Sequence, residues 1–241
     1  MLAVVCCRRG AGRSRPTRDR LLGLSVWRLE LDAEGMFARH RAIRGWRRLT
    51  ALGVRRVLLP EDAFCKEQLK QAGLTPIEPV DLYAALAGPI ALAALTGGGE
   101  EPSQAVVTLC AARADEPLVR AAHFLCPKVK RLSLCVQQGG ERLCAQLYWQ
   151  YGAAVELGGE GAGLRVCFDG TEDPRALDVR HPKERLPGLL LGVDGLDLPA
   201  EWPGDSVLTA LWQSGYIRLE QIEVAWPQNK PLTDAKAGTI M

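Results

Sequence analysis

Short apolar runs alternate with amphipathic segments along most of the chain, an order typical of strands and helices that follow one another. The pattern is clearest between residues 104 and 170. It predicts strands over 105–110, 131–136, 153–157 and 164–168, and helices over 115–125 and 140–151. Because strand–helix–strand units cross over in a right-handed sense, this order indicates a mostly parallel sheet.

The first 95 residues carry the same alternation, and the residues beyond Gly170 carry a looser form of it. The earlier part predicts strands over 1–7, 21–31, 54–59 and 75–78, and helices over 34–52, 61–72 and 82–95. The later part predicts a strand over 189–193, a helix over 206–213 and a strand over 217–225. Gly53 directly follows the first helix, where a glycine adopts the left-handed conformation that ends a helix at little cost.

These elements together predict an α/β protein with a mostly parallel, Rossmann-like sheet and helices on both faces, in two lobes. The run Gly97-Gly98-Gly99, followed by Pro102, is typical of a linker. The predicted organisation is an N-terminal α/β lobe over 1–96, a linker over 97–103, a Rossmann-like lobe over 104–226 and a flexible tail over 227–241.

The turn after the strand 105–110 stands where a dinucleotide-binding fold carries the fingerprint G-x-G-x-x-G. Cys110, Ala112 and Asp115 occupy the three glycine positions. A methyl group at the second position obstructs the approach of a pyrophosphate. Asp115 places negative charge where the helix N-terminus attracts an anion, and it is better suited to capping that helix. We therefore predict no cofactor at this degraded fingerprint, with NADP as the alternative.

The strand 131–136 ends in Gln137-Gln138, so no carboxylate stands there to bind a ribose hydroxyl. Asp169 closes the strand 164–168 at its carboxyl end, the edge at which doubly wound sheets bind ligands. The candidate cofactor-binding residues for any ligand of this lobe are Cys110, Ala112, Arg113, Asp115, Gln137 and Asp169. Cys110 itself is predicted to be an inert thiol, because the neighbouring acids oppose its ionisation.

The segment Gly139-Gly140-Glu141-Arg142-Leu143-Cys144-Ala145-Gln146-Leu147-Tyr148-Trp149-Gln150-Tyr151-Gly152-Ala153 carries a family resemblance. It resembles the part of shikimate dehydrogenase-like and glutamyl-tRNA reductase-like Rossmann domains in which a helix ends in Tyr-Gly-Ala before the next strand. The resemblance spans residues 104–170. It implies an NADP-binding Rossmann domain, but this chain departs from those families at the glycine turn, so their activity is not carried over.

The charge of the chain is unevenly distributed, although the net charge is only +2. Residues 1–59 hold 14 Lys and Arg against 4 Asp and Glu, whereas residues 60–241 hold 16 against 24. Arg41, Arg44 and Arg48 share one side of the helix 34–52 and are candidate anion-binding residues. The competing interpretation is a solvated face or one that docks on the acidic part of the chain. Because no aromatic platform accompanies these arginines, nucleic acid is not the predicted partner.

The eight cysteines form no C-x-x-C pair, and the three histidines lack zinc-site spacing, so we predict no metal. Cysteines inside apolar runs suit a reducing compartment, which predicts a cytoplasmic protein. The apolar stretch 82–95 is interrupted by Gly88-Pro89 and is too short to span a bilayer, so no membrane partner is expected.

No set of residues in the sequence forms an assignable catalytic constellation. The predicted function is therefore a non-catalytic binding or regulatory module on a degenerate dinucleotide-binding scaffold, with a protein or a small anionic ligand as partner. The alternative is a small-molecule enzyme, similar to NADP-dependent oxidoreductases, with an unusual nucleotide site. A second alternative is binding of an anionic partner or nucleic acid through the first 59 residues.

Overall fold

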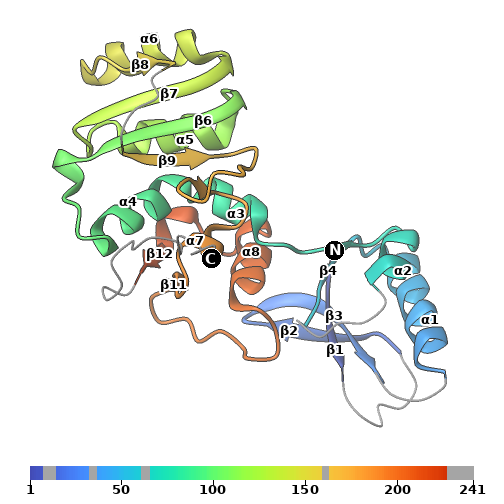
Figure 1. Cartoon of the computed structure of the whole chain (residues 1–241). Coiled ribbons are helices and arrows are strands. Elements are labelled where there is room, and N and C mark those ends of the chain that lie inside the picture. Colours follow the sequence, from blue (N-terminus) through green and yellow to red (C-terminus); the bar gives the residue numbers. More distant parts are fainter. Residues whose placement is uncertain (8–14, 33–36, 61–65, 159–162, 227–241) are drawn as a thin grey trace, which may run out of the picture. The chain divides into compact units, whose positions relative to one another are not determined.

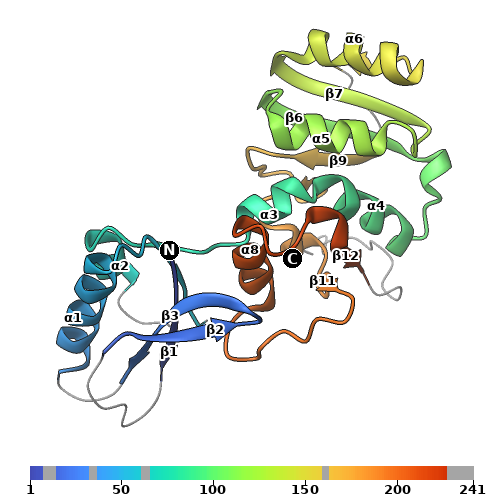
Figure 2. The same ribbon diagram turned by 180° about the vertical axis from the view of Figure 1, so that it is seen from behind.

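The computed structural model describes residues 1–7, 15–32, 37–60, 66–158 and 163–226, which form two compact units (Figures 1 and 2). Unit 1 consists of Met1–Pro79 and Asp194–Gln221, and unit 2 consists of Val80–Val193 and Ile222–Met241. The predicted division at 97–103 is therefore wrong, because the helices after Val80 pack in unit 2. The predicted tail 227–241 lies outside the described residues.

Unit 1 contains a five-stranded sheet in the order β2-β3-β1-β4-β5. Its strands are β1 (Leu2–Cys7), β2 (Thr17–Leu21), β3 (Leu24–Leu31), β4 (Arg56–Leu58) and β5 (Thr75–Pro76). All neighbours are parallel except β2 and β3, which form a hairpin turned at Leu22 and Gly23. The predicted strand over 21–31 is thus the second arm of a hairpin.

Helices α1 (Ala38–Ala51) and α2 (Lys66–Gln71) cover one face of this sheet. The Trp46 side chain of α1 is 1% exposed and packs with Leu29 and Leu31 of β3. A Cβ atom at Gly45 would lie 2.9 Å from a methyl group of Leu29, so the missing side chain lets the helix approach the sheet. Gly53 has φ +77°, which confirms the predicted left-handed end of α1.

Helix α8 (Gly204–Gln213) covers the other face of the same sheet, although it lies far along the chain. Side chains of β1 alternate between the faces, so Ala3 and Val5 point toward α1 whereas Leu2 and Val4 point toward α8. The Trp202 indole N–H donates to the Val5 carbonyl oxygen at 2.7 Å and fastens the returning segment to β1.

Unit 2 contains a second five-stranded sheet, in the order β10-β9-β6-β7-β8, in which every neighbouring pair is parallel. Its strands are β6 (Val106–Arg113), β7 (Arg131–Gln138), β8 (Glu156–Leu157), β9 (Leu164–Cys167) and β10 (Leu177–Asp178). The strand order and direction confirm the predicted α/β, Rossmann-like class.

Helices α4 (Ala87–Gly97), α5 (Glu116–Leu125) and α6 (Gly140–Tyr151) contact this sheet, whose buried residues include Leu109, Leu134 and Val166. Helix α3 (Val80–Ala85) packs against α4 and α5, and the short helix α7 (Pro182–Arg185) lies beside β10. In Figure 2, α5 passes in front of β6. The single helix predicted over 82–95 is divided between α3 and α4 at Leu86.

A separate antiparallel pair, β11 (Leu190–Val193) and β12 (Ile222–Ala225), completes unit 2. Two short 3-10 helices, Pro102–Gln104 and Leu219–Gln221, occupy connecting segments. No helix in the described part of the chain is long and apolar enough to cross a membrane.

Candidate functional site

The turn after β6 is shorter than the sequence predicts. Strand β6 continues to Arg113, because that residue still pairs with Gln138 of β7. Cys110 therefore lies within the strand rather than in the turn. Only Ala114 and Asp115 separate β6 from α5, so the spacing of a dinucleotide-binding turn is not reproduced here.

On either side of this turn, carboxylates of the chain itself accept hydrogen bonds from two backbone amides, one in β6 and one in α5. The Ala112 backbone N–H donates to the Asp169 carboxylate at 2.5 Å, which connects the ends of β6 and β9. The Leu118 backbone N–H donates to the Asp115 carboxylate at 3.3 Å, which confirms the predicted N-cap of α5. The structure thus brings Ala112 and Asp169 together and gives Asp115 a local role.

The loop after β9 is held in place around Gly170. This residue has φ +92°, and a Cβ atom there would collide with the Arg180 guanidinium, so Arg180 lies directly over the loop. The Arg180 guanidinium also lies 3.6 Å from the Asp178 carboxylate, and the Arg180 backbone N–H donates to the same carboxylate. These contacts position Asp169 beside the end of β6.

The next turn of the sheet, between β7 and α6, is open. Gly139 has φ +83° and precedes α6 without a side-chain cap. A hollow of about 660 Å³ lies beside it, lined by Cys135, Val136, Gln137, Gly139, Gly140, Glu141, Arg142, Leu157 and Gly158. The candidate Gln137 thus belongs to this hollow, whereas Arg113 is exposed at the end of β6.

Sequence reasoning missed the Gly139-Gly140 turn as a feature of its own. The available signal was a pair of glycines directly after an apolar strand and directly before a helix. A Cβ atom at Gly140 would lie 2.7 Å from a methyl group of Leu157, so this glycine lets α6 pack tightly on β8. The two glycines therefore allow close packing of α6 and also line the hollow beside it.

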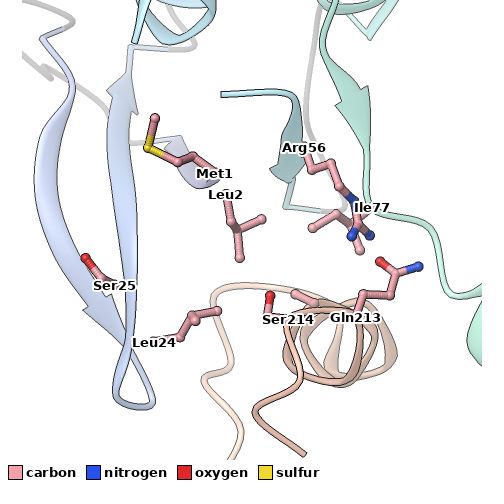
Figure 3. A pocket seen from close by; sticks show the side chains of 9 residues that line it. Met1, Leu2, Leu24, Ser25, Arg56, Ile77, Gln213 and Ser214 are labelled. Carbon is pink, nitrogen blue, oxygen red and sulfur yellow. The ribbon is translucent and has the colours of Figure 1, made fainter. Parts of the chain in front are cut away.

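Unit 1 contains a second, smaller hollow of about 270 Å³ (Figure 3). It lies between the sheet and α8, with Leu2, Leu24 and Ile77 as apolar lining and Arg56 as the cationic group. Its other lining residues are Met1, Ser25, Ala210, Gln213 and Ser214. Because Arg56 lies near the C-terminus of α8, its charge also stabilises the negative end of the helix dipole.

The three arginines predicted to bind anions lie on α1 but differ in their surroundings. Arg41 donates to the Asp32 carboxylate at 3.1 Å and is partly buried. Arg44 and Arg48 are exposed. A shared anion site of all three residues would therefore compete with the ion pair of Arg41 and Asp32.

Polar groups also gather on the α8 side of the first sheet, around Arg28. Its guanidinium lies 3.1 Å from Asp19, 3.5 Å from Glu30 and 3.6 Å from Glu201. The Cys6 thiol donates to Glu201 over 3.6 Å. Burial, with a smaller contribution from the Glu201 charge, raises the pKa of Cys6 to about 11.

This raised pKa predicts a loss of stability at alkaline pH. Since the folded protein disfavours the Cys6 thiolate, the stabilisation is complete below the unfolded pKa of 9.0 and is lost as pH rises toward about 11. The expected loss is at most roughly 2–3 kcal/mol. Urea unfolding at several pH values should show a smaller loss in the Cys6→Ala variant. An equal loss in both proteins would contradict this origin.

Among the described residues, no group of three His, Cys, Asp or Glu side chains could hold a metal ion. Neither a protein-family model nor a curated protein matches the chain.

Proposed function

We propose that this protein is a non-catalytic binding or regulatory module on a Rossmann-like scaffold whose dinucleotide turn is closed by its own carboxylates. The observation that carries the proposal is the hydrogen bond from the Ala112 N–H to Asp169. In a dinucleotide-binding domain the corresponding turn brings backbone amides close to phosphate. Here that amide already has an anionic acceptor.

Electrostatics at the turn also disfavour a pyrophosphate. A phosphate near Ala112 would approach the carboxylates of Asp169, Asp115 and Glu116. Two like charges 4 Å apart repel by about 1 kcal/mol in water, which surrounds this exposed site. The attraction of a helix N-terminus for an anion is about 0.3–1 kcal/mol on an exposed surface. Repulsion by more than one carboxylate exceeds that attraction, which supports a vestigial nucleotide site.

A structural role for Asp169 predicts that the Asp169→Ala variant is less stable than the wild type. The expected loss is about 1–1.5 kcal/mol, near the lower end for a hydrogen bond to a charged group, because the site is exposed to water. Thermal and urea unfolding measure it. Asp194→Ala is the matched control, since Asp194 is also an exposed aspartate before a glycine.

The opposite result would point to a ligand-binding carboxylate. A side chain that serves ligand binding often contributes nothing to the stability of the fold or lowers it. Its removal then leaves the protein equally stable or more stable. Unchanged or increased stability of Asp169→Ala would therefore contradict the closure that we propose.

Thermal unfolding in the presence of NAD, NADP and a short oligonucleotide tests the function itself. A ligand at about 100 times its Kd adds roughly 2.7 kcal/mol to the native state. The proposal expects no shift with either dinucleotide. A shift with NADP would overturn it in favour of the oxidoreductase-like alternative. A shift with the oligonucleotide alone would favour a role for the arginine-rich first 59 residues.

A further inference from the structure

Three cysteines lie in one row across adjacent strands of the unit 2 sheet. Cys110 of β6 pairs in register with Cys135 of β7 on one side and with Cys167 of β9 on the other. None of the three forms a disulfide. Because directly paired residues of a sheet project to the same face, the three side chains lie on one face, opposite the helices.

The spacing of neighbouring strands is compatible with a covalent link between two of these residues. Adjacent strands lie about 4.8 Å apart. The two Cα atoms of a disulfide are usually about 4.4–6.8 Å apart. Two pairs in the row meet this condition, Cys110 with Cys167 and Cys110 with Cys135, so their chemical surroundings must decide between them.

Cys167 has the surroundings of a reactive thiol. Cys110, which pairs with it in register, and Thr171 both favour its thiolate form, and so does the positive charge of Arg165. These groups lower the pKa of Cys167 to about 7, although its burial and the negative charge of Asp178 act in the opposite direction. The lowered pKa favours the thiolate of Cys167, the form that acts as a nucleophile.

Cys110 has the surroundings of a resolving thiol. Its hydrogen bond to Cys167, its burial and the negative charge on Cys167 all raise its pKa, against the effect of the Arg165 guanidinium. That guanidinium also lies 3.3 Å from the Asp173 carboxylate. Cys110 thus keeps its proton next to a nucleophilic partner, because of Cys167 and burial rather than because of the neighbouring acids.

The other described cysteines with a shifted pKa differ from Cys167. Burial raises the pKa of Cys126 and of Cys144, and burial with Glu201 raises that of Cys6. None of these three shifts favours the thiolate. Within the described part of the chain, a lowered thiol pKa is found at Cys167.

We propose that Cys167 and Cys110 are a redox-responsive thiol pair that hydrogen peroxide converts to a reversible disulfide. This redox role is separate from the proposed binding or regulatory function and does not depend on it. Cys167 is only 5% exposed, so the site is suited to a small oxidant rather than to a bulky disulfide such as oxidised glutathione. The link would join β6 and β9 two residues before Ala112 and Asp169, the residues that close the turn.

The reaction balances in two steps. The Cys167 thiolate attacks one oxygen of the peroxide, so an S–O bond forms, the O–O bond breaks, and the second oxygen leaves as water after it takes a proton. Cys110 then loses its proton and attacks the Cys167 sulfur, so the S–S bond forms and the S–O bond breaks, and the oxygen leaves as a second water. Two thiols are oxidised and one peroxide is reduced. A dithiol reductant restores both thiols.

Peptide mapping of the full-length chain tests the pair. The reduced protein is treated with a small excess of hydrogen peroxide at pH 7, remaining thiols are alkylated, and the digest is analysed by mass spectrometry. We expect a linked peptide pair containing Cys110 and Cys167, two hydrogens lighter than the separate peptides, which a dithiol reductant removes. Oxidised glutathione should form this link at least about tenfold more slowly, because Cys167 is buried.

Three variants separate the roles of the row. Cys135→Ser is the matched control, because Cys135 also neighbours Cys110. This variant should form the Cys110–Cys167 link as the wild type does. Cys167→Ser should not form an intramolecular link to Cys110. Cys110→Ser should leave a sulfenic acid on Cys167 that a 1,3-diketone reagent traps. Far-UV circular dichroism shows whether each variant is folded. If a variant is unfolded, the peptide map of the oxidised wild-type protein decides whether Cys110 and Cys167 form the link.

A link through Cys135, the absence of any Cys110–Cys167 link, or oxidation of Cys167 that a dithiol does not reverse would each overturn the proposal. None of these results bears on the closure by Asp169, which the stability of Asp169→Ala tests separately.

Discussion

Replacing Trp46 by Ala is expected to lower the free energy of unfolding of unit 1 by about 3–5 kcal/mol, the usual cost of removing a buried tryptophan side chain. Trp46 is 1% exposed and lies in the cluster that joins α1 to β1, β3 and β4. Truncation leaves a cavity between the helix and the sheet. Urea unfolding followed by circular dichroism measures the loss.

Trp46→Phe and Trp149→Ala are the controls for this prediction. The Trp46 indole N–H has no hydrogen-bond partner among the described residues, so phenylalanine removes an unsatisfied donor while it keeps most of the volume. It should cost much less than alanine. Trp149 is 85% exposed on α6, and its replacement should change stability by no more than about 0.5 kcal/mol. Equal losses for Trp46→Ala and Trp149→Ala would contradict the assignment of the core.

A chain that ends at Pro79 is expected to lose the cooperative fold of unit 1. The fragment would keep all five strands of the first sheet, but the face that carries Leu2, Val4 and Leu58 would lose its cover. In the intact protein the segment 194–221 provides that cover. The α8 residues Val207, Leu208 and Leu211 are each fully buried. At about 25 cal/mol per Å² of apolar surface, a bare sheet face is a large penalty for so small a fragment.

Thermal unfolding of the fragment 1–79 measures this loss, with the full chain as reference. We expect no cooperative transition and binding of a hydrophobic dye. Co-expression of the segment 194–221 should restore a transition, and the Trp202→Ala change in that segment should weaken the restoration, because it removes the hydrogen bond to the Val5 carbonyl. A cooperative transition of the fragment alone would show that α8 is dispensable.

The local elements of this protein follow from short-range features of its sequence. Apolar periodicity predicted α6 over 140–151, and the structure places it at Gly140–Tyr151. Asp115 followed by Pro117 predicted the start of α5, and the Asp115 side chain caps that helix. Both signals act within one or two helical turns, where the sequence neighbours are also the spatial neighbours.

The candidate site could be predicted only in part. Ala112 was identified from its position in the fingerprint turn and Asp169 from its place at the end of a strand, but their hydrogen bond depends on β9 lying beside β6. The register that aligns Cys110 with Cys167 depends on the same pairing. No local pattern encodes it, because the chain places β7, α6 and β8 between these two strands.

The sequence by itself determined the α/β class, most of the helices and strands, and the absence of glycines at Cys110, Ala112 and Asp115. Only the tertiary structure decided that the chain returns at Asp194 to cover the first sheet with α8, that Val80–Gly97 belongs with the second unit, and which thiols are neighbours. The physical reason is that periodicity reports which face of an element is apolar. It does not report which distant segment buries that face, since many apolar surfaces of similar size can satisfy the same hydrophobic demand.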